Sequence, residues 1–262
     1  MTLPFRPRRA RVRPSPVFLA IVAVTAVGGY LSWQATEDTR ATRLGIFLFI
    51  VAGWVVTLSL HEFAHAFLAW RFGDDEIEAR GYLTLNPLKY SHPVLSILLP
   101  VVFIAMGGIG LPGGAVYLHP QRFRTDLQRA IVSLAGPATN AIFGIVLILV
   151  AKQADPSTSV HFFFWLAVAG LGLLQVMAAV LNLLPLPGLD GYGVIEPYLD
   201  PGFRNGADQF KPFGLLIVFA LLQVRQLNQA FFSFVYWLFD LSGLGHRYGQ
   251  AGITLLQFWQ SH

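Results

Sequence analysis

Six long apolar segments limit what this chain can fold into more than any other feature of its sequence. They are residues 17–33, 44–72, 94–109, 130–151, 162–184 and 213–240. Only 12% of the 262 residues are charged, whereas about a quarter are charged in a typical soluble domain. In lipid, every backbone N–H and C=O must be hydrogen-bonded within the protein, which only helices and closed β-barrels achieve. The sequence lacks the series of short segments with alternating hydrophobicity that a barrel requires. The sequence therefore predicts an all-α polytopic membrane protein.

The segments differ in how well they suit a crossing of the membrane, which needs about 20 apolar residues. The first, second, fourth and fifth are adequate. The last is long enough, but Arg225, Gln226 and Asn228 interrupt it. It can form one long helix, or two short helices that turn near Arg225.

The third segment, residues 94–109, is short and contains Pro100. It runs directly into a stretch that is dense in glycine and proline, a composition that favours bends over a continuous helix. Such a stretch can enter a membrane only where protein or a cavity shields its backbone. We therefore expect a re-entrant or irregular hairpin region over residues 80–115.

A basic arm, residues 1–16, precedes the first apolar segment. It carries Arg6, Arg8, Arg9, Arg11 and Arg13. Basic residues beside a spanning helix hold their side of it in the cytoplasm, so the arm predicts a cytoplasmic N-terminus, and nucleic-acid binding is not expected. The rest of the chain, residues 17–262, has the length of a single membrane domain.

The remaining basic residues bear on the number of crossings. If residues 94–109 do not cross, most of them share the cytoplasmic side with the arm, as positive-inside topology requires. That side then carries Arg71, Arg80, Lys89, Arg122, Arg124, Arg129, Arg204 and Lys211, and the outside carries only Arg40, Arg43 and Lys152. A full crossing of residues 94–109 would place Arg122, Arg124 and Arg129 outside and weaken this bias, so the basic residues favour no crossing there. With the other apolar segments as spans, we expect a multi-pass protein of the cell membrane.

The second apolar segment contains a His-Glu-x-x-His motif, formed by His61, Glu62 and His65. Histidines four residues apart lie on one helix face, so both can grip one zinc ion, with the glutamate placed to accept a proton from the attacking water. A polar packing cluster is the alternative. Ionisable residues are costly at membrane depth and are normally functional there, which favours the metal site. The chain has no cysteine, so thiolate ligands and disulfides are excluded.

A catalytic zinc usually has a third protein ligand and one open position. Asp190 follows the fifth segment in a stretch rich in glycine and proline, residues 185–193, although an ordinary turn is the alternative there. Sharing one metal requires the segments 44–72 and 162–184 to run in the same direction. They do so only if residues 94–109 do not cross, which is also what the basic residues favour. Both arguments place the site toward the cytoplasmic side.

The fourth segment contains, near its start, two small residues and an amide in the pattern Gly136-Pro137-x-x-Asn140. Gly136 and Asn140 share a helix face, and small residues let helices approach closely. The amide of Asn140 is either incidental to a packing motif or a donor to a substrate carbonyl or oxyanion. Separately, residues 80–86 have some strand character, so Gly81, Thr84 and Asn86 are candidates for pairing with an extended substrate.

In order and setting, these features resemble the site-2 protease family of intramembrane zinc metallopeptidases, in its compact branch without PDZ or CBS modules. The resemblance rests on residues 61–65, 136–140 and 182–191, with 81–88 in addition, and covers residues 44–199. One departure is Ser91-His92-Pro93, where that family leads us to expect His-x-Asp-Pro, so His92 receives no role.

The resemblance implies one zinc ion per chain, held by His61, His65 and Asp190, with Glu62 as the base and Asn140 supporting the substrate. It also implies that the partners are transmembrane protein substrates and the lipid bilayer. Two alternatives stay open: a pseudo-protease that binds single-span partners, and a metal or proton transporter. A transporter should space its ionisable groups along a full path across the membrane. Here they concentrate at one depth, apart from Arg225.

Overall fold

The structure, a computed structural model, describes residues 12–90 and 122–259. Within these ranges the regular elements are all helical and no strand occurs, which confirms the predicted all-α class. Four helices are long and apolar enough to cross a membrane: α1 (Pro16–Trp33), α2 (Arg40–Arg71), α5 (Asp126–Gln153) and α6 (Phe162–Asn182). The segment 94–109 and most of the expected hairpin region lie outside the described residues.

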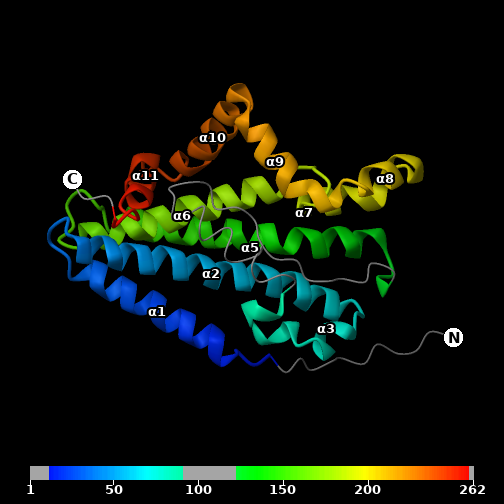
Figure 1. Cartoon of the computed structure of the whole chain (residues 1–262), viewed down its shortest axis with the longest axis horizontal. Helices are drawn as coiled ribbons and strands as arrows, with labels where there is room; N and C mark the ends of the chain where they lie inside the picture. The colour runs from blue at the N-terminus through cyan, green and yellow to red at the C-terminus, as the bar shows by residue number, and fades with distance from the viewer. Residues whose placement is uncertain (1–11, 91–121, 260–262) are drawn as a thin grey trace.

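These four helices form the main bundle (Figure 1). The helices α2 and α6 run in the same direction, and α1 and α5 run in the opposite one. Threonine caps fix where two of them begin: Thr39 accepts from the Thr42 amide at α2, and Thr125 accepts from the Gln128 amide at α5. The C-terminal end of α2 and that of α6 therefore meet at one end of the bundle, as the two-histidine and aspartate hypothesis requires.

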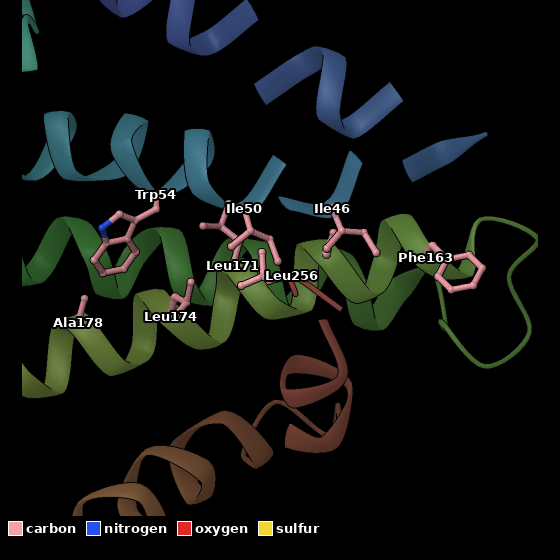
Figure 2. Packing of buried hydrophobic residues seen from close by; sticks show 9 residues of the cluster. Ile46, Ile50, Trp54, Phe163, Leu171, Leu174, Ala178 and Leu256 are labelled. Atoms are coloured by element: carbon pink, nitrogen blue, oxygen red, sulfur yellow. The ribbon is translucent and has the colours of Figure 1, made fainter. Parts of the chain in front are cut away.

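A core of aliphatic and aromatic side chains holds α2 against α6 (Figure 2). Ile46, Ile50 and Trp54 project from α2 toward Leu171 and Leu174 of α6. All five are at most 4% exposed. Burying such side chains contributes about 1.5–3 kcal/mol each in water. In a bilayer, close packing contributes more of the stabilisation, because lipid tails are as apolar as leucine.

The C-terminal apolar segment forms two short helices, α9 (Gly214–Gln223) and α10 (Arg225–Asp240), which meet at 99°. This confirms the alternative with a turn near Arg225. The pair arches over the α6 side of the bundle (Figure 1). The bundle thus has four spans, or up to five if the bent pair is one span, in the part of the chain that the structure describes.

Short helices complete the described chain. They are α3 (Glu76–Ala79), α7 (Asp190–Ile195), α8 (Pro201–Asp208), α11 (His246–Thr254) and the 3-10 turns Tyr82–Thr84, Pro87–Lys89, Glu196–Tyr198 and Lys211–Phe213. The strand character expected for residues 80–86 is wrong. Gly81 adopts φ +73° and the Thr84 hydroxyl donates to the Gly81 carbonyl at 2.7 Å, which closes a turn in place of a strand.

Candidate metal centre

The two histidines of the motif lie on one face of α2, with both side chains buried. Their Nε2 atoms are 3.1 Å apart. The separation of four residues and the helical geometry bring the rings together, as expected from the sequence. Both nitrogens can therefore serve one ion.

Asp190 reaches the same point from the start of α7. Its Oδ2 atom lies 3.2 Å from the His61 Nε2, and its Oδ1 atom lies 3.4 Å from the His65 Nε2. The turn that delivers it depends on Gly188, whose φ of +93° belongs to the region that glycine favours. A Cβ on Gly188 would also collide with the Lys211 carbonyl oxygen.

The charge of Asp190 suits a metal ligand. Without a metal, burial would raise the pKa of this carboxyl, but the positive charge and hydrogen bonds of His65 and His61 outweigh burial and hold that pKa well below its ordinary value. The carboxyl is consequently ionised at neutral pH. A ligating carboxylate must be in this form.

The other ring nitrogen of each histidine is occupied by an acceptor. The His65 Nδ1 donates to the Val132 carbonyl oxygen at 2.7 Å, and the His61 Nδ1 donates to the Asn140 Oδ1. A proton on Nδ1 leaves the Nε2 lone pair for a metal, and such partners are usual around ligating histidines. Both rings are thus held in the tautomer that a metal site needs.

The donor set fits zinc. His61, His65 and Asp190 each offer one ligand atom, and these atoms all lie within 4.8 Å of one another. Two imidazole nitrogens and one carboxylate are the ligand types of catalytic zinc sites, which keep a fourth position open.

Glu62 lies beside this group on α2 and is only 3% exposed. Tyr90 is its neighbour across the fold, with the Tyr90 hydroxyl donating to the Ser59 carbonyl oxygen at 3.2 Å. Burial, and then the Glu62 carboxylate, raises the pKa of Tyr90 above its ordinary value. A buried carboxylate is thus present on the residue that directly follows His61 in α2.

The remaining predicted residues separate into two places. Asn140 is buried against His61 and Gln175. Gly81, Thr84 and Asn86 belong instead to the turns after α3, where the Asn86 side chain accepts from the Leu88 amide at 3.1 Å. Pairing of a substrate with this segment stays a prediction, and the turn conformation does not favour it.

Sequence reasoning missed Gln175, Thr57 and Tyr90. Gln175 is fully buried in the middle of α6 and bonds both Asn140 and Thr57. The signal was present in the sequence, because an uncharged amide within an apolar span needs a partner. The sequence did not show which partner it has.

Comparison with known proteins gives close, nearly full-length relatives. The chain is 52% identical over 258 residues to zinc metalloprotease Rip2 of Mycolicibacterium smegmatis, covering 98% of each chain. It is 50% identical over 254 residues to Rip2 of Mycobacterium tuberculosis, covering 96% of each. It is also 34% identical over 207 residues to zinc metalloprotease YwhC of Bacillus subtilis, covering 74% of this chain and 86% of that one.

No family model and no solved structure matches the chain. The two Rip2 proteins match this chain over almost its whole length, a span that takes in residues 61–65 and 190. The resemblance noted from residues 61–65, 136–140 and 182–191 agrees with the activity in their names. The chain belongs to the site-2 protease family of membrane zinc metalloproteases.

Proposed function

We propose that this chain is an intramembrane zinc metalloprotease that hydrolyses peptide bonds in or near transmembrane segments of membrane proteins. The observation that carries the proposal is the convergence of ligand atoms of His61, His65 and Asp190 within 4.8 Å of one another. Both histidines are buried in the apolar helix α2, and the partly buried Asp190 follows the apolar helix α6. Soluble substrates do not require a catalytic centre that is built into spanning helices. A membrane-embedded peptide does.

The proposed roles follow from the donor set. His61, His65 and Asp190 hold one zinc ion per chain. When bound, zinc supplies a Lewis acid that activates water near neutral pH and polarises a peptide carbonyl. Glu62 accepts the proton of the attacking water and returns it to the leaving amine. His61, Glu62 and His65 are at most 5% exposed, so the α2 side of the site is shielded from bulk water.

We further propose that the site faces the cytoplasm. The start of α1 and the histidine end of α2 lie at the same end of the bundle (Figure 1), and the Ser15 amide donates to the Thr84 carbonyl oxygen at 2.8 Å. The basic arm and most of the other basic residues belong to that end by the chain order. Positive-inside topology then places residues 1–16, and with them the metal centre, on the cytoplasmic side.

Cleavage of a single-span reporter in proteoliposomes tests the function. Purified protein should cut the reporter, a zinc chelator should stop the cutting, and added zinc should restore it. Reporter binding without cutting would indicate a pseudo-protease. Metal flux into the vesicles without cutting would indicate a transporter.

The metal assignment predicts the zinc content of an Asp190 variant. Wild-type protein in detergent should hold about one zinc per polypeptide. The Asp190→Ala variant should lose most of its zinc, because it removes one of the three proposed ligands and leaves only the two histidines to hold the ion. Asp126→Ala, which removes a half-exposed carboxylate at the start of α5, is the matched control and should keep full zinc. Metal analysis after gel filtration measures all three, and full zinc in Asp190→Ala would contradict the assignment.

A further inference from the structure

Three uncharged polar side chains meet in the interior of the bundle, one from each of three apolar helices. They are Thr57 of α2, Asn140 of α5 and Gln175 of α6, and their exposed fractions are 4%, 3% and 0%. Buried polar groups in lipid-facing proteins are expensive unless they bond one another. Here they form one continuous chain that ends on a proposed zinc ligand.

The hydrogen bonds follow one another without a break. The Thr57 hydroxyl donates to the Trp54 carbonyl oxygen at 2.9 Å, with the Gly53 carbonyl oxygen at 3.1 Å. The Gln175 Nε2 donates to the Thr57 Oγ1 at 2.7 Å. The Asn140 Nδ2 donates to the Gln175 Oε1 at 2.7 Å, and the Asn140 Oδ1 accepts from the His61 Nδ1.

The order of donors and acceptors is fixed from the Thr57 end. A hydroxyl has one hydrogen, and Thr57 gives it to its own helix backbone. Its oxygen can therefore only accept from the side of Gln175, which turns the Gln175 NH₂ group toward Thr57. The Gln175 carbonyl oxygen then faces Asn140, so the Asn140 NH₂ group points to it and the Asn140 oxygen points to His61.

We propose that Gln175 and Thr57 are positioning residues of the zinc centre, which fix the amide orientation of Asn140 and so the Nδ1–H tautomer of His61. The inference rests on the proposed function, since it assumes that His61 binds zinc through Nε2. If the Asn140 amide turned over, its NH₂ group would face the His61 Nδ1. The ring would then carry its proton on Nε2, where the metal must bind.

Zinc affinity tests the proposal, measured by competition with a chelator on detergent-purified protein. Gln175→Leu keeps the volume and apolar surroundings but frees the Asn140 amide to turn, so it should weaken zinc binding about 10- to 100-fold. Adding Asn140→Asp to that variant should restore binding, because a carboxylate has two acceptor oxygens and no wrong orientation. Nitrogen NMR of labelled histidine should show the His61 proton moving from Nδ1 in zinc-free Gln175→Leu and returning in the double variant.

A second pair of variants covers the case in which Gln175→Leu does not fold. Thr57→Val removes the acceptor of the Gln175 amide and should weaken zinc binding, whereas Thr57→Ser keeps the hydroxyl and should bind as wild type does. Thr25→Val is the matched control: its hydroxyl also bonds its own helix, to the Ile21 carbonyl oxygen at 3.0 Å, and this bond is not part of the chain to His61. Melting temperatures of the zinc-free proteins separate a loss of fold from a loss of metal.

The outcomes separate this proposal from the function on which it rests. Wild-type protein that binds no zinc would overturn the proposed metal site itself. Wild type that binds zinc, with Gln175→Leu or Thr57→Val binding equally tightly, would overturn only the positioning role. Weak binding that Asn140→Asp fails to restore would also overturn it, because the loss would then be structural and independent of amide orientation.

Discussion

Replacing Glu62 with glutamine should abolish reporter cleavage while about one zinc per polypeptide stays bound. Glutamine has the shape of glutamate but cannot take a proton from the attacking water, so the loss should be about 10²- to 10⁴-fold, the usual contribution of a positioned general base. Glu62 is outside the ligand group of His61, His65 and Asp190, so its exchange leaves every proposed ligand in place. The variant therefore separates the proton-transfer role from metal binding.

The measurement is the cleavage rate in proteoliposomes together with zinc content on the same preparation. Glu78→Gln makes the same chemical change at an exposed position of α3 and should leave both quantities unchanged. Normal cleavage by Glu62→Gln would show that another group is the base. Loss of zinc from that variant would show that Glu62 also helps to hold the metal, in addition to the group of His61, His65 and Asp190.

Local spacing explains which parts of the site could be predicted from the sequence. The helical repeat alone predicts that His61 and His65 share one helix face. Placing Asp190 beside them requires only that the segments 44–72 and 162–184 run in the same direction, which the distribution of basic residues also favours. The structure brings these three residues together. The C-terminal turn near Arg225 was an open alternative, and the helices meeting at 99° decide it.

The partners of Asn140 depend on information that the sequence does not hold. On α6, apolar residues occupy every face, so periodicity does not show how the helix is rotated about its axis. Without that rotation, Gln175 cannot be placed against Asn140, and the Asn140 amide was open to a role toward substrate. In the structure both ends of that amide are bonded, to His61 and Gln175, which favours a positioning role.

Turn chemistry explains the error at residues 80–86. The segment alternates enough to suggest a strand, but Gly81 permits a left-handed conformation and Thr84 bonds back to it. These two local features suffice for a turn. Over so few residues, alternating side chains determine the backbone conformation less strongly than a glycine followed three residues later by a threonine that can close a turn.

Gly136→Ala should remove zinc and activity together, although the change adds only one methyl group. A Cβ at this position of α5 would lie against the Nε2 atoms of both His61 and His65, and 2.5 Å from the Cε1 atom of His61. The space between those two nitrogens is the space that a shared ion must take. Glycine is thus required because α5 lies directly over the site, and helix packing and metal binding depend on the same missing side chain.

The measurement is zinc content and cleavage, with the melting temperature of the zinc-free protein as a check on folding. Overpacking costs about 1–3 kcal/mol in a well-packed core, so some loss of stability is expected in Gly136→Ala. Gly206→Ala in α8 is the matched control, because an added Cβ there meets nothing within 4 Å. A folded Gly136→Ala protein with full zinc would mean that α5 stands further from the histidines than the structure places it. The bond from His61 to Asn140, one turn along the same helix, would then be in doubt as well, because both depend on that one close approach of α5 to α2.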